Sequence, residues 1–191
     1  MISARVVTQF DEKLLELSSQ MDDFEGYSHA HGLRVAEIAE TIAAKFHMAD
    51  HDRFVLQQAA LLHDIGEMAM ARDYIAAARR LTEAEHHDMQ RHTVIGEQDA
   101  AKRGLGKGVQ LLIRWHHEWW NGGGYPDALQ REGIPLSARI LRVADAYASM
   151  NADRPFRQAV GEEDARKHLI HLAGIEFDPR VVSTFLSVPE I

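Results

Sequence analysis

Residues 53–67 read RFVLQQAALLHDIGE, an apolar run at helical spacing that ends in His63, Asp64 and Gly66. Adjacent residues of a helix point about 100° apart, so neighbouring side chains can face one site only near a helix end. Gly66 supplies such an end, because glycine commonly terminates helices. The stretch therefore predicts a helix whose C-terminus presents an imidazole and a carboxylate to one site, with Asp64 able to bridge two ions.

The rest of the chain has the same helical character. Stretches rich in Ala, Leu, Glu, Arg and Gln show apolar residues at helical spacing, and no stretch alternates convincingly like a half-buried strand. The predicted fold class is therefore all-α, a helical bundle. The expected helices cover residues 2–22, 31–46, 53–65, part of 68–80, 109–119, 162–173 and 179–187.

Two further helices are marked by polar residues at their starts. Residues 82–85, TEAE, form a capping box that begins the helix expected to hold His92. Ser137 caps the helix that contains Asp145. Residues 121–126, NGGGYP, must form a loop, because three glycines and a proline cannot sustain a helix.

Seven side chains that commonly bind metals recur in order along the chain. They are His31, His63, Asp64, His92, His116, His117 and Asp145. Five imidazoles and two carboxylates, in a chain without cysteine, suit iron, manganese, nickel or zinc. Seven ligands exceed the usual need of one ion, so we predict two divalent metal ions. The first would be bound by His31, His63, Asp64 and Asp145, and the second by Asp64, His92, His116 and His117.

Length and charge limit the class of protein. A chain of 191 residues predicts one domain at residues 25–191, preceded by an N-terminal amphipathic helix or appendage at residues 1–24. The start has acidic residues and no long apolar core, so we expect neither a signal peptide nor a membrane span. The absence of cysteine agrees with a reducing, cytoplasmic setting. A net charge of -8 disfavours duplex nucleic acid as a partner.

Paired divalent ions with open positions favour phosphoester hydrolysis. Such ions lower the pKa of a bridging water and clamp the oxygens of a phosphate. Because their charge exceeds that of two carboxylates, the site would attract a small anion. The arginines able to hold a phosphate are Arg34, Arg139, Arg142, Arg154 and Arg157. Surface solvation or ion pairing is the alternative for each, and Trp119 either stacks a base or packs in the core.

The predicted ligands lie within short motifs that are spread over most of the chain. These motifs are His31-x-x-Arg34, His63-Asp64-Ile65-Gly66, His92, His116-His117-Glu118, Gly124-Tyr125-Pro126 and Asp145. They resemble the motifs of the HD-GYP family, a branch of the HD phosphohydrolases, over about residues 25–188. The resemblance implies an HD-domain helical bundle and a binuclear or trinuclear metal centre, commonly of iron or manganese. It also implies hydrolysis of cyclic di-GMP to pGpG or GMP by a metal-bridging hydroxide.

The motifs and the residues that flank them suggest further roles. Asp64 and Glu67 are expected to be catalytic. The expected substrate-binding residues are Arg34, Arg139, Arg154, Arg157, Tyr125 and Trp119. Trinuclear members carry a glutamate where this chain has Tyr27, which favours two ions here, with Glu25 as the alternative ligand for a third ion. A signalling protein that contacts the GYP loop and a second copy in a homodimer are further expected partners, and histidines outside the motifs are expected at the surface.

The sharpest departure from the family pattern is Glu67, where the HDIGK signature would place a lysine. The exchange replaces a cation near the substrate phosphate by an anion and lowers the local charge by two units. Either Glu67 binds a metal or acts as a base, or its presence abolishes activity. Three functions therefore stay open: a cyclic di-GMP phosphodiesterase, a degenerate domain that binds metal and a ligand or protein partner in signalling, and an HD-type di-iron oxygenase.

Overall fold

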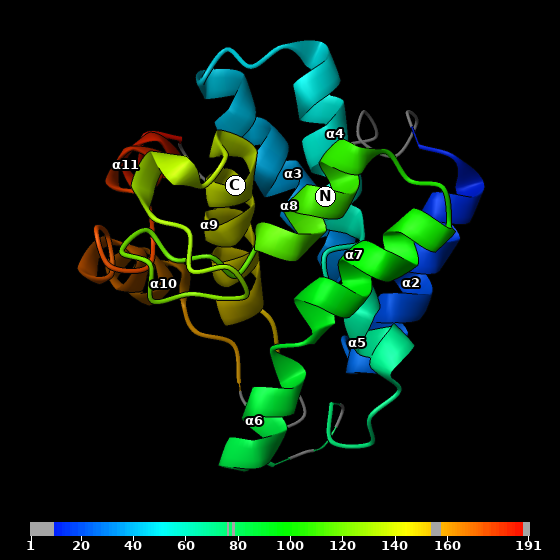
Figure 1. The fold of residues 1–191 in the computed structure, drawn as a ribbon. Coiled ribbons are helices and arrows are strands. Elements are labelled where there is room, and N and C mark those ends of the chain that lie inside the picture. The colour runs from blue at the N-terminus through cyan, green and yellow to red at the C-terminus, as the bar shows by residue number, and fades with distance from the viewer. Residues whose placement is uncertain (1–9, 76, 78, 154–157, 189–191) are drawn as a thin grey trace.

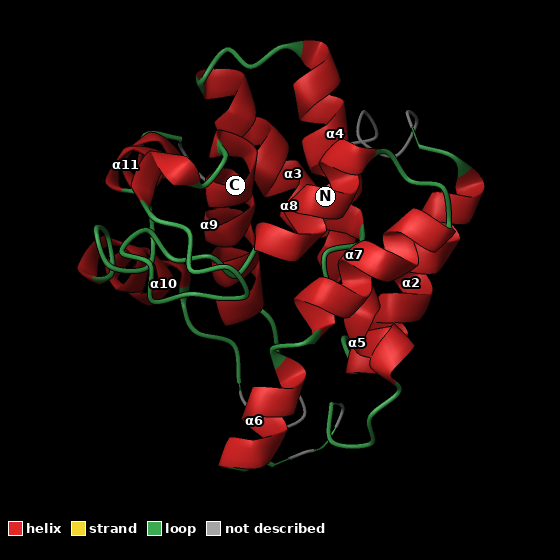
Figure 2. Cartoon of the chain, viewed as in Figure 1, coloured by secondary structure: helices red, strands yellow, loops and turns green. Residues whose placement is uncertain are grey.

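The computed structural model describes residues 10–75, 77, 79–153 and 158–188. Within these ranges every regular element is a helix, apart from an isolated bridge between Ala173 and Phe177. The all-α fold class is therefore confirmed (Figures 1 and 2). The helices are α2 (Glu12–Glu25), α3 (His31–Lys45), α4 (Asp50–Leu61), α5 (Ile65–Met70), α6 (Glu83–Met89), α7 (His92–Lys102), α8 (Lys107–Trp115), the short 3-10 helix η1 (Arg131–Gly133), α9 (Leu136–Met150), α10 (Glu162–His171) and α11 (Pro179–Leu186).

Helix α3 lies at the centre of the bundle and packs against both α4 and α9. Helix α8 packs against α4, α7 and α9, and α7 packs against α5. Helices α10 and α11 cover α9 at one side of the molecule, whereas α2 lies against α5 at the other side (Figure 1). The bundle therefore brings together helices from both halves of the chain.

Apolar spacing determines which face of α3 is buried. Val35, Ile38, Ala39 and Ile42 recur at intervals of three and four residues, and each is fully buried. Burying one aliphatic side chain of this kind contributes about 1.5–3 kcal/mol. No side chain caps the N-terminus of α3. The buried stripe, rather than a cap, therefore holds this helix in place.

The helix expected at residues 53–65 ends earlier than predicted. It stops at Leu61, and Gly66 lies inside the next helix, α5, so Gly66 does not end the first helix. His63 and Asp64 occupy the turn between α4 and α5. The break needed to aim both side chains at one site is therefore present, although a turn provides it rather than the glycine.

The capping box at the start of α6 is confirmed. The Thr82 hydroxyl accepts a hydrogen bond from the Glu85 N–H, and the Glu85 carboxylate accepts one from the Thr82 N–H at 2.8 Å. The capped helix ends at Met89, however, and His92 begins the separate helix α7. His92 thus stands at the first position of a helix, as His31 does in α3.

Helix α2 contains much of the predicted N-terminal segment and packs against α3, α4 and α5. Asp11 caps it by accepting the Lys13 N–H at 2.8 Å, and Gly26 follows its last turn with a φ of 80°. The expected helical residues 2–9 lie outside the described residues, and the domain boundary at residue 25 stays a prediction. Among the helices of the described ranges, none has the length and apolar composition that crossing a membrane requires.

Gly66 lies where α5 and α7 touch. A Cβ atom at this position would lie 1.9 Å from the His92 carbonyl oxygen and 2.7 Å from the Gly96 nitrogen. Both are backbone atoms of α7, so they cannot rotate away as a side chain would. The missing side chain lets α5 approach α7 closely, and this contact brings Asp64 beside His92.

We expect Gly66→Ala to lower the free energy of unfolding by about 1–3 kcal/mol, because an added atom in a packed contact forces the backbone to shift. Chemical denaturation in EDTA measures this change without a contribution from bound metal. Gly133→Ala is the matched control, since a Cβ there would meet nothing within 4 Å. Equal denaturation midpoints for wild type and Gly66→Ala would contradict the close contact.

Candidate metal centre

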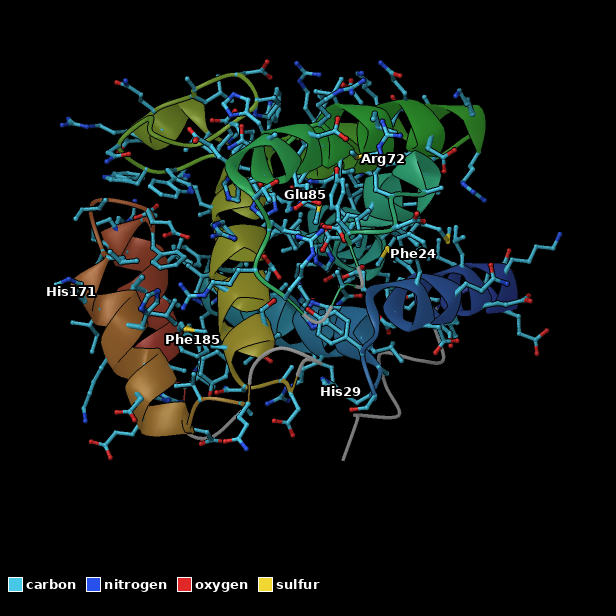
Figure 3. All side chains as sticks on the ribbon, turned by 90° about the horizontal axis from the view of Figure 1, so that it is seen from below. Phe24, His29, Arg72, Glu85, His171 and Phe185 are labelled. Carbon is cyan, nitrogen blue, oxygen red and sulfur yellow. The ribbon has the colours of Figure 1, made fainter. Side chains whose placement is uncertain are left out.

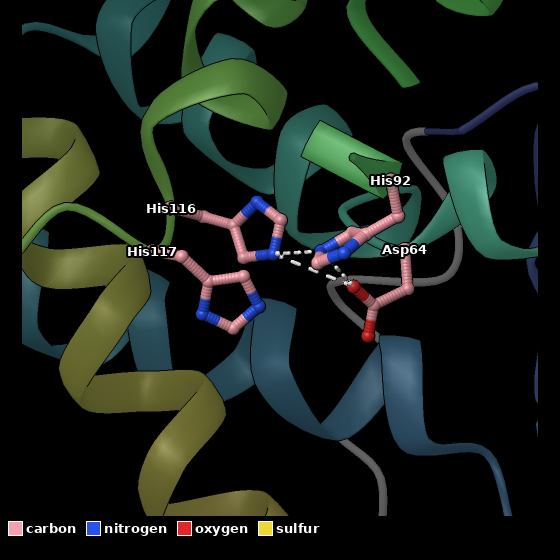
Figure 4. A group of neighbouring side chains, drawn as sticks. All are labelled: Asp64, His92, His116 and His117. Atoms are coloured by element: carbon pink, nitrogen blue, oxygen red, sulfur yellow. Dashed lines mark hydrogen bonds and ion pairs between the residues drawn. The ribbon is translucent and has the colours of Figure 1, made fainter. Parts of the chain in front are cut away.

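All seven predicted metal ligands gather in two neighbouring groups. The first group consists of His31, His63 and Asp145, and the second of Asp64, His92, His116 and His117 (Figure 4). Within each group the ligand atoms lie within 4.8 Å of one another. The side chains come from the first residues of α3 and α7, from the turns after α4 and α8, and from the middle of α9. The bundle thus assembles the centre from five separate segments.

The Asp64 carboxylate lies between the two groups. Its Oδ2 atom is 3.1 Å from His63 Nε2. Its Oδ1 atom is 3.3 Å from His92 Nε2 and 3.4 Å from His116 Nε2. One oxygen therefore faces each group, which is the arrangement that a carboxylate bridging two ions requires.

Asp145 holds the corresponding position in the first group. Its Oδ1 atom is 3.6 Å from His63 Nε2 and 3.7 Å from His31 Nε2, and it accepts the Ser149 hydroxyl at 3.0 Å. The Tyr27 ring stacks on the His31 ring with the centroids 4.0 Å apart, and its hydroxyl is 3.5 Å from Ser149 Oγ. Tyr27 thus supports one ligand by stacking and reaches the other through Ser149.

Backbone carbonyls determine how three of the histidine rings point. Nδ1 of His63, His92 and His116 donates to the carbonyl three residues earlier, at 2.9, 2.6 and 2.7 Å respectively. A neutral ring that donates from Nδ1 keeps an unprotonated Nε2. The Nε2 atoms of His92 and His116 are 3.2 Å apart, with Asp64 Oδ1 beside both (Figure 4). Lone pairs this close repel one another unless a cation or an extra proton lies between them.

Unpaired polar atoms at this centre fit a metal site. His31 Nε2, His63 Nε2 and Asp64 Oδ1 are buried and have no hydrogen-bond partner among the described residues. Each unpaired buried polar group costs about 1–3 kcal/mol, so three in one place indicate a ligand. Neutral imidazole nitrogens and carboxylate oxygens suit iron, manganese, nickel and zinc. The two clusters are therefore consistent with a binuclear site, and the identity of the metal stays a prediction.

Nearby charges shift the pKa values of the ionisable groups in the centre. Burial opposes ionisation of Asp145, but the nearby His31 and His63 imidazoles outweigh it and hold the pKa of Asp145 well below its usual value. Burial likewise opposes protonation of His63, yet the charges of Asp64 and Asp145 raise the pKa of His63 well above its usual value. A metal ion would replace the proton that His63 takes up, so metal uptake competes with protonation.

Glu67 lies beside the ligand groups but belongs to neither. Its side chain is buried on α5 and faces the cavity next to the centre. Burial raises the pKa of Glu67 well above its ordinary value, and the negative charges of Asp64 and Asp145 add to this rise. The catalytic role expected for Glu67 stays a prediction.

A cavity of about 360 Å³ opens beside the two groups. Besides metal-binding side chains, it is lined by Glu67, Arg142, Ser149, His168, Glu176 and Phe177. Nothing in the sequence singled out Glu176 or His168, because neither belongs to a motif and the chain reaches the cavity there only through packing of α10 and α11. A larger hollow of about 620 Å³ between α2 and α4 contains none of the seven ligands.

The loop with the GYP motif folds back over the second group. The buried Glu118 carboxylate accepts the N–H of Asp127 at 2.7 Å and of Leu129 at 2.9 Å. The Tyr125 N–H donates to the His117 carbonyl at 3.1 Å, and the centroids of their rings are 4.9 Å apart. Glu118 therefore anchors the loop, and Tyr125 packs against the ring of a predicted ligand.

Tyr125 does not line the cavity, and neither do three further predicted substrate-binding residues, Arg34, Arg139 and Trp119. The Arg139 guanidinium donates to Asp178 at 2.6 Å, which ties α9 to the start of α11. Arg34 and Trp119 are also absent from the cavity walls, and their roles stay predictions. The residues outside the described ranges include Arg154 and Arg157.

The histidines outside the motifs are exposed, as expected. They are His29, His47, His51, His86, His87, His168 and His171. Figure 3 shows His29 and His171 on the outside of the molecule. Exposure therefore separates these histidines from the mostly buried ligand set.

Comparison with known families agrees with this arrangement. The family described as HD domain matches residues 12–181. The chain belongs to the HD domain family. The match spans all seven predicted ligands of this HD domain and extends from the start of α2 into α11.

Relatives of this HD domain include phosphodiesterases that act on cyclic dinucleotides. The cyclic di-GMP phosphodiesterase response regulator RpfG of Xanthomonas campestris is 33% identical over 178 residues, which cover 92% of this chain and 47% of the relative. The 3'3'-cGAMP-specific phosphodiesterase 2 of Vibrio cholerae is 31% identical over 159 residues, which cover 82% of this chain and 30% of the relative. The chain thus spans less than half the length of these relatives.

Solved structures share the fold of this HD domain. A cyclic GMP-AMP specific phosphodiesterase of Vibrio cholerae matches with a TM-score of 0.73 at 20% identity, covering 92% of this chain and 47% of that chain. The HD domain of the phosphodiesterase PgpH of L. monocytogenes, in complex with cyclic-di-AMP, matches with a TM-score of 0.60 at 14% identity. The match covers 94% of this chain and 99% of that chain. The HD-domain helical bundle is therefore confirmed.

We expect Asp64→Ala to remove metal from both groups, because its carboxylate faces both, whereas Asp145→Ala removes metal mainly from the first group. Elemental analysis after loading with iron or manganese and dialysis gives the metal content per chain. Asp88→Ala is the control, since Asp88 pairs with Arg72 and Tyr74 outside the centre. Unchanged metal content in Asp64→Ala would refute the bridging assignment.

Glu118→Gln should loosen the GYP loop, because an amide NH2 group would then face one of the loop N–H donors. An unmet buried hydrogen bond of this kind costs about 1–3 kcal/mol. Hydrogen exchange should become faster at the amides of Asp127 and Leu129. The exposed Glu132 in the same loop gives the matched control, Glu132→Gln. If exchange at both amides stays as slow as in the wild type, Glu118 is not the anchor.

Proposed function

We propose that this HD domain is a metal-dependent phosphodiesterase that hydrolyses a cyclic dinucleotide, with cyclic di-GMP as substrate and pGpG or GMP as product. The observation that carries the proposal is Asp64, which directs one oxygen to each of two histidine groups. Relatives at about 30% identity that are named cyclic di-GMP phosphodiesterases support the choice of substrate.

Two divalent ions bound there would activate water and stabilise the charge that develops on the phosphoryl oxygens. The protein's own contribution is a set of ligands that need no rearrangement. The carbonyl bonds keep His63, His92 and His116 from rotating. Against the effect of burial, the neighbouring histidines keep the pKa values of Asp64 and Asp145 well below their usual values, so both carboxylates stay ionised. Such preorganisation is a main source of catalysis in buried sites.

The adjoining cavity supports a small-molecule substrate. Its volume of about 360 Å³ falls within the range of about 300–1,000 Å³ that is usual for such pockets. Its walls include Asp64, Asp145 and His117, so a phosphate placed in it would lie against both ligand groups. Tyr125 donates its N–H to the His117 carbonyl and packs its ring against the His117 ring, so it supports that wall.

Glu67 favours a second candidate function, a domain that binds metal and ligand without hydrolysing the ligand. Its carboxylate lines the cavity beside Asp64 and Asp145. An ionised carboxylate in that place repels a phosphodiester and weakens the binding of the transition state, whose phosphoryl oxygens are also negative. On this alternative the domain would signal through contact with a partner protein.

An assay for hydrolysis separates the two functions. Protein loaded with iron or manganese should convert cyclic di-GMP to pGpG or GMP, as followed by chromatography, and Asp64→Ala should not. We expect Glu67→Lys to raise the rate by about tenfold or more, the effect of gaining one contact with a charged group. Glu132→Lys, with the same change of charge on the surface, is the control.

The outcomes are distinct. Intact cyclic di-GMP after long incubation with metal-loaded protein that binds it would refute the phosphodiesterase and favour the degenerate domain. Faster hydrolysis of 3'3'-cGAMP in a parallel reaction would overturn cyclic di-GMP as the preferred substrate and leave the phosphodiesterase class intact.

A further inference from the structure

The cavity beside the metal centre is unusually acidic for a phosphodiester site. Four carboxylates line it, from Asp64, Glu67, Asp145 and Glu176. When ionised, these four charges cancel those of two divalent ions, which leaves no net attraction for a phosphate. Arg142 is the one lysine or arginine among the described residues that line this cavity. Its charge therefore decides the sign of the field that a substrate meets.

Arg142 is held in a defined position on the cavity wall. Its Nη1 donates to Asp145 Oδ2 at 3.1 Å and to His117 Nδ1 at 3.3 Å, and its Nη2 donates to Glu176. Its Cζ lies 5.7 Å from the centroid of the Phe177 ring, at cation–π distance. The guanidinium thus keeps one orientation between the metal ligands and the segment before α11.

The donors of Arg142 are not used up by these contacts. A guanidinium carries five N–H groups. The three hydrogen bonds of Arg142 use both N–H groups of Nη1 and one of Nη2. Arg142 Nε is buried without a hydrogen-bond partner among the described residues, so the second N–H of Nη2 is the donor left for a ligand, and 15% of the side-chain surface is exposed. Because its neighbours already fix its rotamer, binding an anion costs it little side-chain entropy.

We propose that Arg142 binds the substrate phosphate and is the cation that makes this acidic cavity accept a phosphodiester. The inference rests on the proposed function and names a binding residue for it. A guanidinium suits this role because its parallel N–H groups match the oxygens of a phosphate. Arg142 contacts the substrate without taking part in bond making or breaking.

The contacts of Arg142 also fit a purely structural tie between Asp145 and Glu176. A structural tie predicts that loss of the charge lowers metal content together with anion affinity. A phosphate ligand predicts a loss of anion affinity at unchanged metal content. Glu67 separates the two cases, because a lysine there would place a cation in the same cavity from α5 without restoring the ion pairs of Asp145 and Glu176.

Calorimetric titration of manganese-loaded protein with inorganic phosphate, and then with cyclic di-GMP, tests the proposal. We expect Arg142→Gln to weaken phosphate binding by about tenfold or more, and Glu67→Lys added to it to recover most of the loss. Manganese content, measured for every variant, should stay at the wild-type value. Arg166→Gln is the matched control, because Arg166 lies over Phe185 at 5.1 Å and does not line the cavity.

Unchanged phosphate affinity in Arg142→Gln would overturn the proposal. A loss of phosphate affinity that comes with a loss of bound manganese, and that Glu67→Lys does not recover, would overturn it as well. If Arg142→Gln does not fold, the Glu67→Lys single variant is used instead. It should bind phosphate more tightly than the wild type does. A phosphate affinity equal to that of the wild type would refute the role of cavity charge. Phosphate binding that depends on Arg142, in a protein that leaves cyclic di-GMP intact, would contradict the proposed function but keep this inference.

Discussion

The position of one carboxylate, Asp64, is the constraint on which the rest of the structure depends. Its two oxygens face separate groups of imidazole nitrogens, and those nitrogens come from the turn after α4, the start of α7 and the turn after α8. Buried lone pairs without a hydrogen-bond donor are costly, and among the described residues His31 Nε2, His63 Nε2 and Asp64 Oδ1 have no such partner. Binding of cations removes that cost, so the centre and the helices around it stabilise one another.

Packing of the backbone sets the spacing of this centre. The contact between α5 and α7 leaves no room for a side chain at Gly66, and it brings the turn with Asp64 next to His92. The Glu118 carboxylate accepts two backbone N–H groups of the GYP loop. The loop so held places the Tyr125 ring against the His117 ring. Two motif residues, Gly66 and Glu118, thus act by geometry: Gly66 lacks a side chain, and Glu118 accepts hydrogen bonds from loop N–H groups.

Charge, rather than shape, distinguishes the functions open to this HD domain. The two groups contain all seven predicted ligands, and a cavity adjoins them. The walls of that cavity carry groups of opposite charge type, the Glu67 carboxyl on α5 and the Arg142 guanidinium on α9. On the proposed function, a phosphodiester would enter only if metal ions and the guanidinium outweigh the carboxylates, so the charges at these two positions would govern its binding.

The sequence by itself determined the helical class and picked out the seven side chains that gather in two groups, because apolar spacing and the donor atoms of side chains are local properties. It also predicted that Asp64 would face two groups, although it placed the break at Gly66, whereas packing against α7 keeps that glycine inside α5. The sequence named Glu118 in a motif and Arg142 among five arginines, but only the tertiary structure decided which groups they contact. Their partners Leu129 and Glu176 lie 11 and 34 residues further along the chain, and no local spacing encodes contacts made by folding over such distances.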